Sequence, residues 1–298
     1  MKKLPALYII LAGCLWGTMG LFVRRLNAMG LGSIEIVVMR CIVATIILFP
    51  VTMVKDRKLL VIKKKNILPL VASGWASILF FNYCYFSTIS LMNLSAAAIL
   101  LYTSPIFVML LSLVFFKEKL TVRKILALLL AFGGCCLVSG IATSDTAITL
   151  QGLLLGLGSG LGYALYSIFS RVSLNQGLSS ITITDYTFLF SAIGGVFLAD
   201  LGTIGKVYTA YGIEFLGFAI FYTVVTTVLP YLLYTKGLSE VENGPASVMA
   251  AIEPVVATVL GFLVFSERPT VSAVLGILLV LLALILLNLS PKKKNEEI

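Results

Sequence analysis

Long apolar runs separated by short polar segments fill this chain from one end to the other. Each run holds about 20 residues, enough for a helix to cross the ~30 Å hydrocarbon core of a bilayer. A membrane β-barrel would instead show segments of about 10 residues with alternating polarity. The pattern therefore predicts an all-α integral membrane protein with ten transmembrane helices, at residues 4–23, 34–54, 67–89, 92–116, 122–141, 151–170, 181–200, 211–235, 245–265 and 270–289.

The composition agrees with this prediction. Hydrophobic residues make up 59% of the 298 positions, charged residues only 12%, and the mean hydropathy is +1.07. Ten spans of about 20 residues leave connections too short to hold a soluble catalytic domain. Histidine, the commonest catalytic base and metal ligand, is absent. We expect no metal and no cofactor, and interpret five cysteines without metal-ligand spacing as small packing residues: Cys14, Cys41, Cys84, Cys135 and Cys136.

The first residues resemble an export signal with a lipid-attachment cysteine. Lys2 and Lys3 precede an apolar stretch that reaches Cys14. The apolar character continues to Val23, however, which gives a length that spans a membrane rather than a short removable segment. We therefore interpret this stretch as the first transmembrane helix.

The basic residues predict how the chain lies in the membrane. If ten helices follow a cytoplasmic amino terminus, the inner segments hold seventeen of them and the outer segments four, namely Arg24, Arg25, Lys206 and Arg268. Cytoplasmic loops of membrane proteins carry such an excess of Lys and Arg. We expect a multi-pass protein of the plasma (inner) membrane with both termini in the cytoplasm. The net charge of +9 then reflects topology and contact with anionic lipid, and we expect no nucleic-acid partner.

The chain also contains an internal repeat. A shift of 149 residues aligns positions 87–121 with 236–270 without a gap, and it pairs Pro105 with Pro254 and Glu118 with Glu267. The two predicted units are residues 1–145 and 146–298, with five helices each. Because five is odd, the second unit enters the membrane from the opposite side. Inverted repeats of this kind are typical of secondary transporters, with a substrate site near mid-depth between the halves.

The repeated segments resemble a known family. "SPIFVMLLSLVFFKEKLT" and "EPVVATVLGFLVFSERPT" are similar to each other and to the EamA unit of the drug/metabolite transporter superfamily, as are Gly13 to Gly17 with Trp16, and Arg40. The resemblance implies a ten-helix exporter or exchanger of small metabolites, with a central cavity lined by both halves. Leu165 and Tyr166 stand where the repeat of Trp16 and Gly17 would fall, so the two sides of such a cavity differ chemically.

Glu253 is the sharpest candidate for a functional residue. It lies eight residues into its span, which at 1.5 Å per residue is ~12 Å deep. An acidic side chain at that depth costs about 2.5–3.5 kcal/mol on insertion scales, so it should face a cavity, meet a partner or carry a proton. Its repeat partner is the neutral Ser104. A packing role beside Pro254 is the alternative.

Two further charged residues fall within predicted spans. Arg40 could neutralise Glu253 or attract an anionic group of the substrate, which makes it a candidate for charge pairing or coupling. It could equally snorkel toward the outer surface. Asp185 lies only a few residues inside its span, and we expect it at the membrane interface.

Aromatic residues recur at helical spacing on several spans. Side chains three positions apart share one helix face, and such faces with hydroxyl groups suit amphiphilic or cationic organic solutes. The alternative for part of the set is an interfacial aromatic belt. Asn82 is a polar candidate at mid-span, with an interhelical hydrogen bond as its alternative role. The predicted substrate-binding residues are Trp16, Asn82, Tyr83, Phe86, Tyr102, Tyr163, Tyr166, Tyr231, Tyr234 and Glu253.

These patterns favour a secondary active transporter of a small organic metabolite such as an amino acid or amine. We expect export by alternating access around the aromatic cavity, with protons as a possible coupling ion through Glu253, because burial favours the protonated form of a carboxylic acid. An intramembrane lipid-modifying enzyme is the alternative, but no acidic pair at helical spacing lies inside a span. A channel or regulatory protein is a third class. The pattern specifies no oligomeric state.

Overall fold

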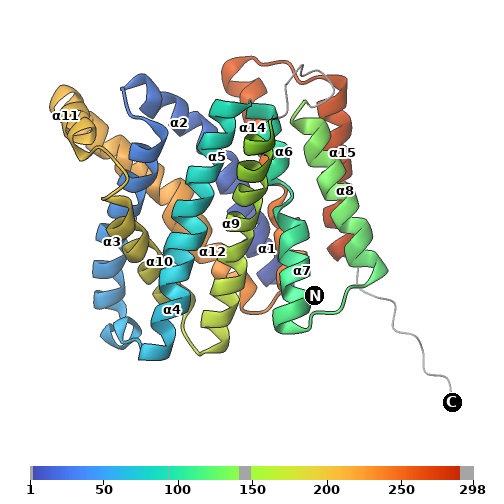
Figure 1. Ribbon diagram of the computed structural model, residues 1–298, viewed down its shortest axis with the longest axis horizontal. Helices are drawn as coiled ribbons and strands as arrows, with labels where there is room; N and C mark the ends of the chain where they lie inside the picture. Colours follow the sequence, from blue (N-terminus) through green and yellow to red (C-terminus); the bar gives the residue numbers. More distant parts are fainter. Residues whose placement is uncertain (1–2, 93, 141–148, 289–298) are drawn as a thin grey trace.

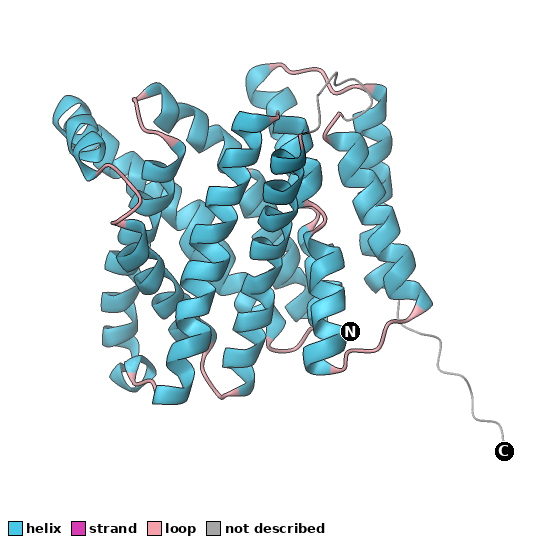
Figure 2. Ribbon diagram, viewed as in Figure 1, coloured by secondary structure: helices cyan, strands magenta, loops and turns pink. Residues whose placement is uncertain are grey.

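The computed structural model describes residues 3–92, 94–140 and 149–288, and helices joined by short connections make up this part of the chain (Figures 1 and 2). The first half contains α1 (Lys3–Gly17), α2 (Met19–Ala28), α3 (Ser33–Lys55), η1 (Arg57–Leu60), α4 (Lys64–Ala72), η2 (Ser73–Leu79), α5 (Phe80–Leu91), α6 (Leu94–Leu101), α7 (Ser104–Phe116) and α8 (Val122–Val138). The second contains α9 (Leu150–Asn175), α10 (Ser180–Gly195), α11 (Leu201–Thr223), η4 (Val224–Val228), α12 (Leu229–Leu238), α13 (Asn243–Ala250), α14 (Glu253–Phe265) and α15 (Val271–Asn288).

Apolar helices of membrane-spanning length dominate this all-helical fold. Eight helical stretches in the described residues have at least 18 residues and the apolar composition to cross a bilayer. The other two predicted spans, at 122–141 and 181–200, correspond to α8 with 17 residues and α10 with 16. Many large apolar side chains point outward along the helices, as they must where lipid is the solvent. The protein is therefore a multi-pass membrane protein, although α8 and α10 are shorter than the sequence predicted.

Two predicted boundaries were wrong. The first span continues past Val23 to Ala28, so Arg24 and Arg25 lie on α2 rather than in a connection. The eighth begins at Leu201 instead of 211, because α11 runs through a kink at Gly212, where φ is 55°. Only glycine adopts such a conformation without strain. The segment before the kink contains polar residues, which concealed its helical character in the hydropathy pattern.

Contacts at the helix ends define two ends of the bundle. At the first, which we call end A, Arg123 at the start of α8 donates from Nε to the Leu286 carbonyl of α15 at 2.5 Å. At the second, end B, Arg24 of α2 pairs with Glu267 after α14 at 2.8 Å, and Arg25 pairs with Glu214 of α11 at the same distance. The chain starts α1 and ends α15 at end A (Figure 1). It starts α9 at end B, where Gly152 approaches Met92 after α5. The two halves therefore run in opposite directions.

Helices of the two halves pack in matching pairs. α1 contacts α12 while α9 contacts α5, and α3 packs on α10 as α8 packs on α15. Figure 1 shows α8 and α15 at one side of the bundle, α3, α10 and α11 at the other, and α1, α9 and α12 between them. The π-helical segments η2 and η4 occupy equivalent places in the third helix of each half. The fold is thus a duplicated repeat with its centre at α1, α9 and α12.

The fourth helix of each half is interrupted near its middle. α6 ends at Leu101 and α7 starts at Ser104, whereas α13 ends at Ala250 and α14 starts at Glu253. A proline stands at the second position of both α7 and α14, where its missing N–H removes no helical hydrogen bond. Both half-helices then end on a left-handed residue, Lys117 or Ser266. Non-helical backbone at membrane depth is tolerated where protein covers it. Here α9 covers the interruption between α6 and α7, and α1 covers the interruption between α13 and α14.

Candidate functional site

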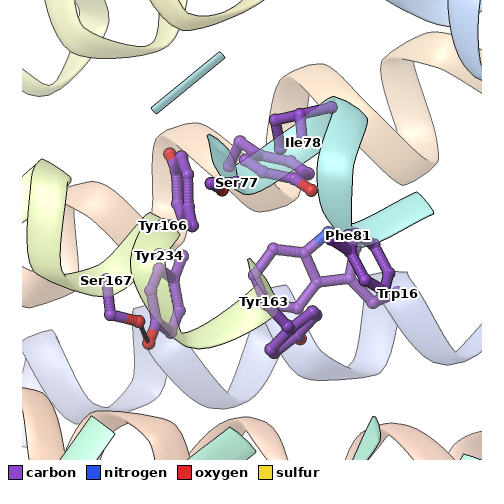
Figure 3. A pocket seen from close by; sticks show the side chains of 9 residues that line it. Trp16, Ser77, Ile78, Phe81, Tyr163, Tyr166, Ser167 and Tyr234 are labelled. Atoms are coloured by element: carbon purple, nitrogen blue, oxygen red, sulfur yellow. Dashed lines mark hydrogen bonds between the residues drawn. The ribbon is translucent and has the colours of Figure 1, made fainter. Parts of the chain in front are cut away.

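Five aromatic side chains from three helices gather at the centre of the bundle. Trp16 of α1 lies with its ring centroid 5.2 Å from that of Tyr231, 5.3 Å from Tyr234 and 6.1 Å from Tyr163. Tyr166 packs on Tyr231 at 4.8 Å with the rings nearly perpendicular. Edge-to-face packing of this kind is favourable beyond the area that it buries. The result is an aromatic pocket, lined by Trp16, Ser77, Ile78, Phe81, Tyr163, Tyr166, Ser167, Tyr231 and Tyr234 (Figure 3).

Hydroxyl groups hold two of these tyrosines in position. The Tyr234 hydroxyl is 2.7 Å from Ser167 Oγ, and the Tyr166 hydroxyl is 2.7 Å from Thr235 Oγ1. These pairs join α9 of the second half to α12 and keep each phenol hydrogen-bonded within the apolar centre. The pocket encloses about 10 Å³, which is room for about one water molecule. The bundle is therefore closed around the aromatic pocket in this conformation.

A second small pocket adjoins the first through Tyr163. It is also about 10 Å³, and Glu253 lines it together with Leu101, Tyr102, Ser104, Pro105, Tyr163, Ser247, Ala250 and Ala251. Tyr163 donates its hydroxyl to Glu253 Oε2 at 3.3 Å. One tyrosine thus borders both pockets and contacts the carboxyl group between the two broken helices.

The local position of Glu253 follows from the interruption of the helix. It is the first residue of α14, and the backbone N–H groups of a first helical turn lack partners within the helix. Gly17 of α1 lies against this point, and a Cβ added there would come within 2.6 Å of the Glu253 carbonyl oxygen. On the other half, a Cβ at Gly160 of α9 would come within 2.8 Å of the Leu100 carbonyl oxygen beside the first interruption. Glycines on the two crossing helices therefore permit the close approach that forms the pocket walls.

Arg40 lies inside the protein rather than at the surface. Its exposed fraction is 2%, so the snorkelling alternative was wrong. Its guanidinium group donates from Nη2 to Asn82 Oδ1 at 3.5 Å and from Nη1 to the Met19 sulfur at 3.6 Å, while Nε has no partner among the described residues. Glu253 is not among its ion-pair partners in that part of the chain. Arg40 is thus a buried cation that the described carboxylates do not neutralise.

Tyr231 is influenced by both of these opposite charges. It interacts electrostatically with both Arg40 and Glu253, and it lines the aromatic pocket. Asn82, which we expected to bind substrate or to form an interhelical hydrogen bond, contacts Arg40 and the Ile78 carbonyl instead of entering either pocket, with Nδ2 2.7 Å from that oxygen. One tyrosine of the aromatic pocket therefore interacts electrostatically with a positive and a negative group.

The structure separates two further predicted residues from the pockets. Tyr83 is 55% exposed on the outside of α5, and Phe86 packs against the core and the Tyr85 ring without lining either pocket. Both lie on the same span as Asn82, but a helix presents only one face to the centre. Trp16, Tyr102, Tyr163, Tyr166, Tyr231, Tyr234 and Glu253 do line the pockets.

Sequence reasoning missed several small lining residues. Ser167 stands four positions after Tyr163, so helical spacing alone places the two on one face. Ser77 gave no such signal, since it lies in the π-helical segment η2, whose wider turn departs from regular spacing. Ser104 and Ser247 border the second pocket, and only the interruptions bring them there.

Asp185 is buried against neighbouring helices. It is the sixth residue of α10, near the helix end where we expected it, and its exposed fraction is 0% because α10 is packed between α3, α4 and α12. It lines neither pocket. Among the described residues, no group of three or more His, Cys, Asp or Glu side chains could hold a metal ion.

The sequence of the protein matches the profile of the EamA-like transporter family twice, over residues 3–140 and 150–289. The chain belongs to the EamA-like transporter family. The two matches correspond to the two halves of the fold, which have the same helix order and opposite directions. Proteins that align with this EamA-like transporter over its full length are therefore expected to share the duplicated arrangement.

Relatives of this EamA-like transporter come from bacteria and archaea. An uncharacterized transporter of Archaeoglobus fulgidus is 27% identical over 90% of both chains. The uncharacterized transporter YxxF of Bacillus subtilis is 25% identical over 94% of this chain and 88% of its own. The uncharacterized inner membrane transporter YicL of Salmonella typhimurium is 23% identical over 97% and 96%. A crystal structure with 14% sequence identity superposes with a TM-score of 0.79 over 97% of both chains, which supports the fold alone.

Proposed function

We propose that the protein exports a small organic metabolite, an amino acid, amine or similar amphiphile, by alternating access around the aromatic pocket. The observation that carries this proposal is the carboxyl group of Glu253 beside Tyr163, at the interruption between α13 and α14. Interrupted helices in transporters place ionisable and backbone groups at a mid-membrane site. The aromatic rings supply faces that attract organic cations, and the carboxylate supplies a negative charge.

The pair of opposite charges favours a zwitterionic substrate. Glu253 would receive an ammonium group, and Arg40 would attract a carboxylate once its helix moves to open the pocket. Tyr231 interacts with both charges and would contact the body of the substrate. An amine without an acidic group would use Glu253 alone. Buried Arg residues within membrane spans are costly, and a transient anionic partner in the transport cycle offsets that cost.

Glu253 would also couple transport to protons. A buried carboxyl group favours its protonated form, whereas an ammonium group favours the carboxylate. Binding of a proton and binding of substrate at Glu253 would then exclude each other. Exchange of the two across the membrane would drive export with the inward proton gradient.

The two closed ends support alternating access. At end A, Glu118 after α7 accepts hydrogen bonds from the backbone N–H groups of Asn243 and Gly244 at 2.8 and 3.2 Å. Arg171 of α9 donates to Asn243 Oδ1 at 2.9 Å and also to the Val241 carbonyl. End B is closed by the exposed pairs of Arg24 and Arg25. We propose that end A faces the cytoplasm of an inner membrane, in line with the basic residues that the sequence places there.

Reconstituted vesicles test the role of Glu253. Wild-type protein and Glu253→Gln would be assayed with a panel of labelled amino acids and amines, first with an imposed proton gradient and then in exchange mode without one. We expect the variant to lose gradient-driven transport, because an amide can neither carry a proton nor balance an ammonium group. Glu240→Gln, at an exposed position after α12, is the matched control and should behave as wild type. Undiminished gradient-driven transport by Glu253→Gln would refute the proposal.

A further inference from the structure

Asp185 is a buried carboxyl group that the aromatic site does not use. It lies on α10, its exposed fraction is 0%, and neither of its side-chain oxygens has a hydrogen-bond partner among the described residues. Thr52 on α3 interacts with Asp185, and its buried hydroxyl likewise lacks a hydrogen-bond partner in that part of the chain. Two buried polar side chains without hydrogen-bond partners among the described residues thus lie at the contact between α3 and α10.

An ionised carboxylate in this place would be very unfavourable. Burial of a charge without a counterion costs several kcal/mol even after the protein relaxes around it, so such groups are usually neutralised. A protonated carboxyl group carries no charge, and its O–H can donate one hydrogen bond. Thr52 Oγ1 is an unpartnered acceptor within the described residues that faces it. The Thr52 hydroxyl can also donate to the carboxylate, but one hydroxyl does not balance a buried negative charge, so only the neutral acid leaves no charge uncompensated.

The charged neighbours do not supply a counterion. Tyr186, next to Asp185 on α10, is the titratable side chain that interacts with it electrostatically, and its hydroxyl donates to the Leu60 carbonyl at 2.6 Å. The elements packed on α10 also carry the neutral phenols of Tyr166 and Tyr231, which face the aromatic pocket, and Arg40, which contacts Asn82. Their remaining basic residues lie at helix ends and none is at ion-pair distance from Asp185: Lys55, Arg57, Lys58, Lys64, Lys65, Arg171 and Lys236.

We propose that Asp185 is a second proton-binding site of this transporter, which holds a proton in the closed conformation and shares it with Thr52. The site is separate from Glu253, since Asp185 borders neither pocket, and the assignment does not require Glu253 to be coupled. α3 and α10 belong to different halves of the fold and pack along each other. Relative movement of the halves would admit water at this contact and release the proton. Proton occupancy of Asp185 thus favours the closed contact.

Infrared difference spectroscopy on the purified protein tests this assignment directly. The carbonyl stretch of a protonated carboxylic acid is separate from the amide bands, and it moves when the sample is transferred to D₂O. Because a protonated Glu253 would give a band of the same kind, the comparison is made in the Glu253→Gln background: we expect the band at neutral pH in Glu253→Gln and its loss in Glu253→Gln/Asp185→Asn. Asn has the shape of the neutral acid, so this variant is expected to fold. Thr52→Val should keep the band but shift its frequency, because the hydrogen bond to the hydroxyl is removed.

The pH dependence of unfolding gives an independent measurement. The unfolded chain releases the proton of an aspartic acid near pH 3.9, so above about that pH a protonated Asp185 makes folding take up one proton. Stability then falls as pH rises, by up to about tenfold in the unfolding equilibrium constant per pH unit. We expect Asp185→Asn to lose this part of the pH dependence. Asp200→Asn, which changes an exposed carboxylate at the start of α11, should retain it.

Three results would overturn the proposal. One is a carboxylic acid band that persists in Glu253→Gln/Asp185→Asn, since the proton would then lie on another group. Another is the same pH dependence of unfolding in wild type and Asp185→Asn. The third is stabilisation of the wild type, but not of Asp185→Asn, by sodium ions at constant pH, which would identify a metal-ion site instead. If Glu253→Gln transports normally while the Asp185 band behaves as expected, the aromatic-site proposal fails and this one stands.

Discussion

α7 begins at Ser104 and α14 begins at Glu253, at equivalent positions of the two halves, and a proline follows each. The backbone of the two interruptions is closely similar, because both half-helices end on a left-handed residue and both meet a glycine of a crossing helix. The side chains differ. The second half places a carboxyl group and Tyr163 at its interruption, whereas the equivalent positions of the first half hold Ser104 and Cys14.

This difference shows that the residues that shape the backbone recur in both halves, whereas the charged side chain occurs in only one. The prolines and the left-handed caps act on the backbone and stand at equivalent positions of both halves, whereas Gly17 and Gly160 meet the two interruptions from different positions of α1 and α9. A transporter needs only one carboxyl group at the centre, and a second one beside it would place two like charges in low-dielectric surroundings. The acidic position is therefore free to differ once the backbone is fixed.

The largest effect is expected from the glycines at the two interruptions. Gly17→Val and Gly160→Val would each drive a branched side chain into a carbonyl oxygen of the facing helix, because even a Cβ comes within 2.6 and 2.8 Å of one. Overpacking of this kind costs about 1–3 kcal/mol or more. Thermal unfolding in detergent should show similar losses for both variants, with Gly133→Val as the control, since its Cβ would have nothing within 4 Å. A loss in only one of the two would contradict the equivalence of the interruptions.

An intermediate effect is expected at Glu118. Its carboxylate accepts hydrogen bonds from the first two N–H groups of α13, so it caps that helix from another element. Loss of a helix cap costs about 0.5–2 kcal/mol. Glu118→Ala should lower the unfolding midpoint and open end A, which cysteine accessibility at Gly244→Cys would report. Glu118→Asp, which keeps the charge on a shorter side chain, should give a smaller change; equal changes would argue against capping.

The smallest effect is expected at the equivalent Glu267. This residue pairs with Arg24 at 2.8 Å, and the two side chains are 52% and 56% exposed. Exposed ion pairs contribute about 0–1 kcal/mol and are screened by salt. Glu267→Ala should therefore change the unfolding midpoint less than Glu118→Ala does, and high salt should remove the remaining difference from wild type. A greater loss at Glu267 than at Glu118 would reverse the assignment of end A as the more tightly closed end.

Much of the site could be predicted because aromatic and acidic residues in spans are conspicuous. Trp16, Tyr163 and Glu253 stand out in apolar sequence, and the structure places all three at the pockets. Tyr83 shares the same aromatic character but lies on the outer face of α5. Hydropathy does not distinguish the two faces of a span that is apolar all round, since lipid and protein core are equally apolar.

The sequence by itself determined the helical class, the repeat and the residues that interrupt the fourth helices. Length, apolar composition and the paired prolines act locally or at fixed spacing, so they are readable along the chain. Only the tertiary structure decided which charges meet. It placed Arg40 beside Asn82 instead of at the surface, and it buried Asp185 at the contact between α10 and α3. The neighbours of a buried charge come from other helices, and their approach depends on packing between halves that no single segment encodes.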